Sequence, residues 1–436
     1  MQNVLQPSTI RKLRIRITWF AALLFLANYL DRVNVSFAAL QMNADLNLSP
    51  LAYGFGAGVF YIGYVAFEVP SNLLLYKVGA RRWIARIMVT WGLLSAALCF
   101  ARNAEEFFII RFLLGAAEAG STPGVIYWMS KWMPAEERAK AVSRYMSAGP
   151  IAVIFGAPLS GLILTTLNGA LGLHGWQWMF IVEGLPVAIL GVVVWFALPE
   201  QPAKAKWLDD GEKGTLTRIL AEEEAANVSG GRHSFGAAVR NPLVWQLVAL
   251  YFCFMVGTNA IIYWLPQIIN GFGELSKLQV SLLSAIPYLF TFMVMGAYGR
   301  HSDRTGERRL HIACSGFLAG AALICSAYVP PVAALACISL ACAAVWSNLG
   351  PFWALPTTFL TGSAAAGGLA MINSIGQIGG FTGPYVVGWI KSTTHSFSSG
   401  LMFMAAAELI GGIIAVMLPV AIAAARPQAT ATPVRT

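Results

Sequence analysis

Charged side chains are scarce in this chain of 436 residues. Aspartate, glutamate, lysine and arginine make up 11% of it, whereas hydrophobic residues make up 57% and the mean hydropathy is +0.64. Soluble domains carry roughly 25% charged residues. The scarcity excludes an ordinary soluble protein and indicates a chain whose surroundings are lipid.

Residues that build disulfides, metal centres and phosphate-binding loops are few or badly spaced. The six cysteines include no CxxC pair and all fall in apolar stretches, which argues against a disulfide framework or a zinc site. The five histidines are scattered, which argues against a membrane-embedded metalloenzyme. No Gly-Lys pair occurs, so the sequence lacks the phosphate loop of an ATP-driven pump. We therefore expect no enzyme activity, no cofactor and no metal.

Long apolar runs dominate what is present. A helix needs about 20 apolar residues to cross a bilayer, and the runs are unbroken, whereas the strands of a membrane barrel alternate in polarity over roughly 10 residues. The predicted fold class is an all-α polytopic membrane protein with twelve transmembrane helices in two six-helix bundles. The twelve stretches lie near 17–40, 53–75, 84–101, 107–129, 141–166, 177–198, 243–269, 279–299, 310–328, 332–359, 365–390 and 399–424.

The net charge of +9 comes from the loops and gives no support to a nucleic-acid partner. When successive loops are assigned to alternate sides, nearly all lysines and arginines fall on the side of both termini. Only Arg102, Lys277 and Lys391 fall on the opposite side. Cytoplasmic loops carry the excess of Lys and Arg in membrane proteins. We predict a multi-pass protein of the cell inner (plasma) membrane with both termini cytoplasmic.

A polar central loop, 199–241, separates the twelve stretches into two sets of six. Within this loop, residues 207–225 are predicted to form an amphipathic helix on the cytoplasmic surface. The sequence thus predicts an N-terminal bundle at 1–198 and a C-terminal bundle at 242–436. No partner domain is visible in the sequence, and a monomer is expected.

One loop motif occurs in both halves. GRHSDRTGERR (Gly299–Arg309) follows the eighth stretch, and NLLLYKVGARR (Asn72–Arg82) follows the second. The pattern G-x-x-x-D-R-x-G-x-R-R resembles the signature loop of the major facilitator superfamily. The first copy departs from this pattern, because Asn72 and Tyr76 replace its glycine and its aspartate.

Four further strings resemble the anion:cation symporter family within that superfamily, and the resemblance extends to about residue 425. They are NYLDRVNVSFA, FEVPSNLLLYKVGARRWIARIMVTWG, RFLLGAAEAGSTPGVIYW and WQWMFIVEGLP. The degenerate first loop is also typical of this family. The resemblance implies proton-coupled symport of an organic anion, such as a sugar acid, an aromatic acid or a dicarboxylate, by alternating access.

Charged residues inside two apolar stretches predict where the anion and the protons bind. Asp31 and Arg32 are neighbours in the first stretch, and Arg111 and Glu118 are two helical turns apart in the fourth. Each charge in mid-bilayer costs about 2.5–3.5 kcal/mol, and neighbours on a helix do not face each other. We therefore expect a polar site that the first and fourth helices share. The alternative is a pair of buried salt bridges that only join these helices.

Side-chain chemistry suggests a role for each of these four residues. The planar guanidinium of arginine matches a carboxylate, whereas a membrane carboxylate can change its protonation. In our hypothesis ionised Glu118 holds Arg111 in the empty carrier, and protonation of Glu118 releases Arg111 or admits the substrate anion. Asp31 is then the second proton site and Arg32 the main substrate ligand. The resemblance also supports Asp31 and Glu118 as proton carriers and Arg32 as the substrate ligand.

Other residues are predicted to complete the pocket and the gates. Glu68 is expected to brace a gate through contacts with the loop arginines. In the second half, Asp303, Arg304 and Arg308 are expected to form the corresponding gate. The pocket candidates are Tyr29, Tyr64, Trp353, Asn373 and Gln377. The resemblance supports Tyr64, Trp353 and Asn373.

Several expectations stay open. Glu183 is expected to be structural, and Glu408 has no predicted role. Gly149 and Gly350 stand where polar side chains are expected in sugar-acid carriers, which favours a less hydroxylated substrate. A facilitator, an exchanger or a nutrient sensor for organic acids on the same fold is the alternative function, and uphill uptake driven by a pH gradient alone distinguishes it from symport.

Overall fold

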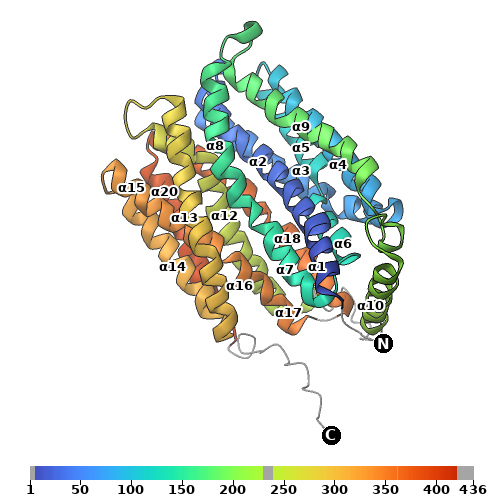
Figure 1. The fold of residues 1–436 in the computed structure, drawn as a ribbon. Helices are drawn as coiled ribbons and strands as arrows, with labels where there is room; N and C mark the ends of the chain where they lie inside the picture. The colour runs from blue at the N-terminus through green and yellow to red at the C-terminus, as the bar shows by residue number, and fades with distance from the viewer. Residues whose placement is uncertain (1–4, 229–238, 361, 420–436) are drawn as a thin grey trace.

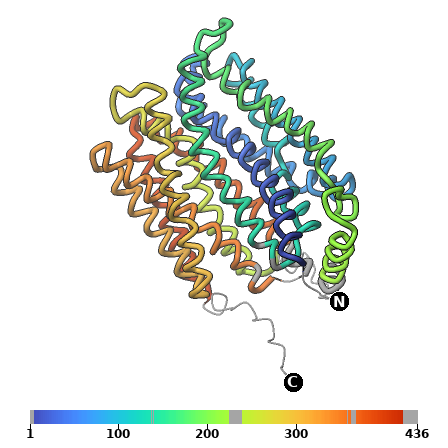
Figure 2. The backbone as a smooth tube through the Cα atoms, viewed as in Figure 1, coloured from blue at the N-terminus to red at the C-terminus, as the bar shows by residue number. Residues whose placement is uncertain are grey.

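The structure is a computed structural model that describes residues 5–228, 239–360 and 362–419. Within these ranges the regular structure is entirely helical. Figures 1 and 2 show long helices running side by side, with the first half of the chain (blue to green) beside the second half (yellow to red). The predicted units 1–198, 199–241 and 242–436 include residues 1–4, 229–238, 361 and 420–436, which lie outside the described part.

Ten helical stretches of the described residues are long and apolar enough to cross a membrane. They are Pro7–Asp45, Pro50–Val78, Ala80–Phe100, Lys140–Thr166, Gly175–Ala197, Pro242–Asn270, Lys277–Thr305, Arg309–Ser326, Pro331–Ala354 and Ser398–Val416. The two other expected spans, 107–129 and 365–390, each consist of two shorter helices. These are α5 (Ala104–Glu118) with α6 (Ser121–Ser130), and α18 (Gly362–Gly376) with α19 (Ile378–Thr394). The all-α membrane fold predicted from the sequence is confirmed.

The remaining helices follow one another through short connections, apart from the central loop. Those of the first half are α1 (Pro7–Leu13), α2 (Trp19–Asp45), α3 (Pro50–Val78), α4 (Ala80–Ala97), α7 (Ala135–Met146), α8 (Ala148–Thr166) and α9 (Gly175–Ala197). The central loop contributes α10 (Asp210–Val228). Those of the second half are α12 (Pro242–Asn270), α13 (Lys277–Thr305), α14 (Arg309–Ser326), α15 (Pro331–Ser347), α16 (Leu349–Ala354), α17 (Pro356–Phe359) and α20 (Ser398–Val416).

Capping side chains fix where the long helices begin. The Ser49 hydroxyl accepts a hydrogen bond from the Ala52 amide at 3.1 Å, and Pro50 occupies the first position of α3. Ser276 and Gln279 form a reciprocal capping box at the start of α13. These caps satisfy backbone donors that have no partner within a helix, and proline at the first position loses no helical hydrogen bond.

Glycines bring α3 and α5 into direct backbone contact. A Cβ on Gly115 would lie 1.9 Å from the carbonyl oxygen of Phe60, and a Cβ on Gly63 would lie 2.2 Å from that of Phe112. Small residues permit this close approach in membrane helices, where dispersion contacts replace the hydrophobic effect as the driving force. The contact therefore fixes the depth at which the charged residues of α5 face α3.

The fourth span breaks next to Glu118. This glutamate is the last residue of α5, and Gly120 adopts a left-handed φ of +83° before α6 begins. The Ser71 hydroxyl donates a hydrogen bond of 2.6 Å to the freed carbonyl of Ala119, and Trp83 Nε1 donates to Ser71 at 3.0 Å. A freed carbonyl inside a membrane protein needs such a partner. The break thus places a carboxyl group at a helix end near the middle of the bundle.

The two copies of the repeated loop make similar turns. Gly79 and Gly306, which occupy the same place in the motif, both have positive φ, +96° and +67°. In the second copy Arg308 forms an ion pair of 3.0 Å with Asp303. In the first copy Tyr76 stands where the aspartate is missing, and its ring contacts that of Tyr127 at 4.6 Å. The turn glycine is therefore retained where the ion pair is replaced by an aromatic contact.

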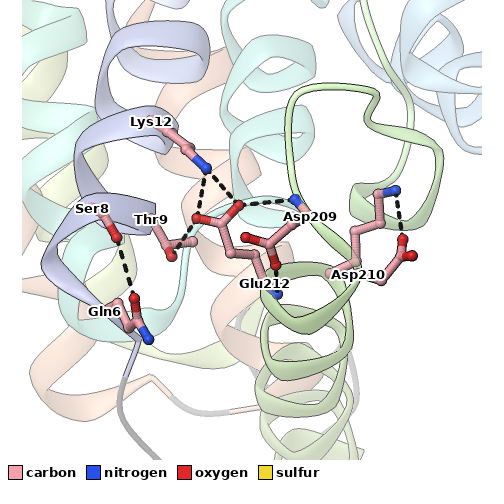
Figure 3. A network of polar contacts seen from close by, with 8 residues as sticks. Gln6, Ser8, Thr9, Lys12, Asp209, Asp210 and Glu212 are labelled. Atoms are coloured by element: carbon pink, nitrogen blue, oxygen red, sulfur yellow. Dashed lines mark hydrogen bonds and ion pairs between the residues drawn. The ribbon is translucent and has the colours of Figure 1, made fainter.

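Helix α10 docks against the first half at the lower end of the bundle in Figure 1, beside α1. Glu212 accepts hydrogen bonds from Lys12 Nζ at 2.7 and 2.8 Å and from the Thr9 hydroxyl at 2.9 Å (Figure 3). Partial burial raises the pKa of Glu212, but the bonds from Lys12, the Asp209 amide and Thr9 outweigh it and hold that pKa below its ordinary value. The stacked rings of Trp132 and Trp207 extend this contact.

Gly115→Ala tests the backbone contact between α3 and α5. The new methyl group meets the Phe60 carbonyl, so we expect a loss of about 1–3 kcal/mol of stability from overpacking and a lower melting temperature of the purified protein in detergent. Gly299→Ala is the control, because a Cβ there meets nothing within 4 Å. Equal melting temperatures for the two variants would contradict the close approach.

Candidate functional site

Asp31 and Arg32 point to different parts of the molecule. Asp31 is buried and accepts hydrogen bonds from Trp91 Nε1 and the Ser95 hydroxyl on α4, and from Asn34 Nδ2 at 3.1 Å. Arg32 instead reaches α5, where its guanidinium forms an ion pair with Glu118. Adjacent residues on a helix point about 100° apart, so the two charges serve two separate environments.

The Arg32–Glu118 pair lies within a group of aromatic rings on α3. The Arg32 guanidinium lies 5.4 Å from the ring centre of Phe60, 5.9 Å from that of Tyr61 and 5.6 Å from that of Tyr64. The Arg32 side chain is 14% exposed, whereas that of Glu118 is fully buried. Such rings stabilise a desolvated cation. Pocket candidate Tyr64 is therefore placed beside the arginine that was predicted to bind the substrate.

The expected pairing of Arg111 with Glu118 is wrong. Arg111 Nε donates to the Gly56 carbonyl at 3.2 Å, and its Nη2 donates to the Ala57 carbonyl at 3.1 Å and to the Tyr263 hydroxyl at 3.4 Å. Two helical turns separate Arg111 from Glu118, about 10 Å along the axis. Backbone carbonyls of α3 lie closer to Arg111 than the carboxylate does. Arg111 thus joins α5, α3 and α12.

Glu68 does not contact the loop arginines as expected. Its Oε1 accepts from Asn373 Nδ2 at 2.6 Å, and its Oε2 accepts from the Ser374 hydroxyl at 2.8 Å. Both donors lie on α18, so the brace spans the two halves of the chain. Glu68 is buried, and both of its carboxylate oxygens are engaged by these two donors. Asn373, a pocket candidate, is therefore engaged by a protein carboxylate in this state.

The other pocket candidates lie in three different settings. Tyr29 is buried with its ring 5.3 Å from that of Trp346 on α15. Trp353 packs against Tyr251 at 5.1 Å between ring centres. Gln377 lies at the junction of α18 and α19, and its buried Oε1 has no hydrogen-bond partner among the described residues. Of these three, Gln377 has an unused polar atom for a ligand.

Tyrosines missed at the sequence level connect the halves near the candidate site. The Tyr61 hydroxyl donates to Asn259 Oδ1 on α12. Tyr251, also on α12, lies close enough to interact electrostatically with both Arg32 and Glu68. The spacing of Tyr61 and Tyr64 by three residues puts both on one face of α3, a signal that could have found Tyr61. Tyr251 has no such signal, because it reaches the site from the other half.

The halves are closed against each other at the end of the bundle where α2 ends and α3 begins, here called the α2–α3 end. The Leu51 amide donates to the Ser392 hydroxyl at 2.9 Å, and the Tyr53 hydroxyl donates to the Tyr263 carbonyl at 2.8 Å. Gly54 lies so near α19 that a Cβ would be 2.4 Å from the Pro384 carbonyl oxygen. Backbone contacts of this kind seal the α2–α3 end.

Among the described residues, no group of three or more His, Cys, Asp or Glu side chains could hold a metal ion. His301 Nδ1 and His311 Nε2 lie 2.8 Å apart next to the second signature loop. The Nδ1 atom of His311 already contacts the Glu307 carbonyl. This histidine pair therefore stabilises the turn and has no place in the central site.

The sequence matches the family model of the Major Facilitator Superfamily over residues 21–384. The chain belongs to this superfamily. It is 45% identical over 417 residues to an Agrobacterium vitis protein named as a tartrate transporter, covering 95% of this chain and 92% of that one. It is 39% identical over 410 residues to the Pseudomonas putida protein named as metabolite transport protein NicT, covering 93% and 94%.

A solved structure shows the same fold. The inward open conformation of the xylose transporter XylE from E. coli superimposes on this major facilitator protein with a TM-score of 0.73 at 18% identity, covering 92% of this chain and 95% of that one. At this identity the likeness shows the fold alone. The family match and the named relatives establish that the protein is a membrane transporter of this superfamily and not an enzyme.

A double-mutant cycle on Glu68→Gln and Asn373→Ala tests the brace between the halves. Each single substitution leaves a buried partner poorly satisfied, so we expect each to cost about 1–3 kcal/mol, and the double variant to lose less than the sum. Melting temperatures of the four proteins in detergent measure the coupling. Strictly additive losses would show that these two side chains do not interact.

Proposed function

We propose that this protein is a proton-coupled symporter of an organic anion in the inner membrane, with both termini cytoplasmic, working by alternating access. The observation that carries the proposal is the ion pair between Arg32 and buried Glu118. A guanidinium fork that holds a protein carboxylate in the empty carrier is also shaped to hold a substrate carboxylate. Glu118 and the substrate therefore compete for Arg32.

Protonation of Glu118 decides this competition. A neutral carboxyl group loses most of its attraction for the guanidinium, while burial in a low dielectric penalises an uncompensated charge. Arg32 then binds the substrate anion when it arrives, and the proton on Glu118 is transported together with this anion. The sequence suggested that Glu118 holds Arg111 in the empty carrier and releases it on protonation. We assign this role to Arg32 instead, because Arg111 is bound by the backbone of α3 and by Tyr263.

The relatives support a carboxylate as the substrate. A protein named as a tartrate transporter shares 45% of aligned residues with this chain, and tartrate is a dicarboxylate with hydroxyl groups. Arg32 supplies one carboxylate fork beside Tyr64. Gln377 offers an unpartnered amide oxygen that can accept from a hydroxyl group. We infer a small dicarboxylate or hydroxy acid, which Tyr29, Trp353 and Asn373 enclose in other states of the cycle.

The charge distribution predicts that the α2–α3 end faces outward. Arg102, Lys277 and Lys391 are the few basic residues on that side, whereas the basic loops lie at the opposite end. The sealed contacts of Leu51, Tyr53 and Gly54 then close the outer entrance. Glu68 and the signature-loop pair of Asp303 with Arg308 lie toward the inner side, where we propose that they gate release together with Arg304.

Glu118→Gln tests proton coupling in proteoliposomes with a panel of organic acids that begins with tartrate. The wild type accumulates its substrate when the outside is more acidic than the inside. The variant, which cannot ionise, loses gradient-driven accumulation but retains exchange of labelled for unlabelled substrate. Glu105→Gln is the control, because Glu105 is exposed on the same helix. Intact accumulation by the Glu118 variant would refute the scheme, and a wild type that only exchanges or equilibrates would favour an exchanger or a facilitator.

Arg32→Gln tests the substrate ligand. A substrate that binds only the folded state raises the melting temperature by mass action. Loss of a charge-assisted fork costs about 1.5–3 kcal/mol, so we expect the dissociation constant to rise roughly 10- to 100-fold. The matched control is Arg102→Gln, whose guanidinium pairs with Glu106 in an exposed loop. Unchanged ligand-induced stabilisation in Arg32→Gln would move the anion site elsewhere.

A further inference from the structure

A second buried carboxyl group lies inside the first half, apart from the Arg32 site. Glu183 on α9 is buried, and its Oε1 accepts a hydrogen bond of 2.7 Å from the Ser160 hydroxyl on α8. Its Oε2 is buried as well and has no hydrogen-bond partner in the described part of the chain. A purely structural glutamate would be expected to satisfy both oxygens.

Asn34 connects Glu183 to Asp31. Its side chain donates to Asp31 Oδ1 at 3.1 Å, and it lies close enough to Glu183 to act on that carboxyl group electrostatically. Asp31 and Glu183 interact electrostatically as like groups. An amide nitrogen carries two N–H donors, so one asparagine can serve both acids. The result is a chain of three polar side chains from α2 to α9.

The helices packed around this chain supply few charges. Arg111 and Glu118 act on Asp31 electrostatically, with opposite signs. Toward Asp31, α4 presents the neutral donors Trp91 and Ser95.

Toward α9, α4 presents the backbone of Gly92 and Ala96 next to Gly184, and α8 presents Ser160. No lysine or arginine of the described residues forms a salt bridge with Glu183 or Asp31. The guanidinium on the residue after Asp31 is held by Glu118. Among the described residues, therefore, no ion pair compensates two negative charges on Asp31 and Glu183.

Two interacting acids in this setting do not ionise independently. Burial penalises each charged form and the first negative charge penalises the second. A pair of this kind takes up and releases its protons in two steps that belong to the pair and not to either residue. One proton held by either acid leaves a single charge on the pair, and the Asn34 amide can stabilise that charge by donating to it.

We propose that Asp31 and Glu183 hold one proton in common and that Glu183 is a further proton-binding residue of this transporter. The role of this proton in transport rests on the proposed proton coupling at Asp31. Glu183 lies eight residues after the start of α9, about 12 Å from the α2–α3 end, whereas Asp31 lies about 21 Å from it. The pair thus extends the proton site from Asp31 toward the α2–α3 end, and this extension does not pass Arg32.

Infrared titration of the purified protein tests the pair without transport. Glu183→Gln removes the like-charge neighbour, so Asp31 should lose its proton at a pH about one unit lower than in the wild type. Asp31→Asn is the reciprocal variant and lowers the midpoint of Glu183 equally, which keeps the test available if one variant does not fold. Glu408→Gln is the control, because Glu408 is equally buried but lies on α20 against Gly257. This substitution should remove a carboxyl band without moving the Asp31 midpoint.

Equal midpoints for Asp31 in the wild type and in Glu183→Gln would overturn the proposal and leave Glu183 as a structural hydrogen-bond acceptor. Gradient-driven uptake is measured separately as a function of pH. If the infrared midpoint shifts but uptake by the wild type does not depend on the pH gradient, symport is refuted and the shared proton is supported. If Glu183→Gln shifts both the infrared midpoint and the pH midpoint of uptake, the pair and its role in coupling are supported.

Discussion

The ion pair between Arg32 and Glu118 is the constraint around which the rest of the site is arranged. Lipid cannot solvate either charge, so Arg32 needs a partner, and Glu118 needs a partner or a proton, at every stage of a transport cycle. The aromatic rings of Phe60, Tyr61 and Tyr64 keep water scarce around the guanidinium and strengthen its attraction to any carboxylate. In the proposed mechanism Arg32 is never left without a partner. It exchanges one carboxylate for another, and this exchange would link proton binding to anion binding.

Backbone geometry would allow the proposed exchange at Arg32. Glu118 ends α5 just before the left-handed turn at Gly120, and Ser71 satisfies the carbonyl that the break exposes. Gly115 one turn earlier locks the same helix against α3. The carboxyl group is therefore mounted on a rigid helix at a point where the backbone is already interrupted, as in other transporters whose sites use discontinuous helices. Rearrangement of α6 can occur without moving the contact that holds Arg111.

Hydrophobic runs, loop charges and the repeated signature loop were enough to predict the all-helical membrane fold, because these follow from the solvent alone. Residue identity also indicated which charges matter. Pairing could not be predicted: the sequence spacing favoured Arg111 for Glu118, but the direction of each side chain depends on how closely α3 and α5 approach. The same limit explains Glu68, whose partners Asn373 and Ser374 lie some 300 residues away on α18. Tyr251 and Tyr263 were missed because they enter the site from the other half.

The distribution of contacts between the halves bears on how the carrier changes state. At the α2–α3 end the closest approach of the halves is between backbone atoms, because Gly54 and Gly388 allow α3 and α19 to touch. Deeper in the bundle they meet through Tyr61 with Asn259, and through Glu68 with Asn373. Backbone contacts are insensitive to protonation, whereas Glu68 can lose its charge. In the proposed mechanism, a change at Glu68 would alter its contact with Asn373, which lies away from the sealed end, while the backbone contacts of Gly54 and Gly388 keep their geometry.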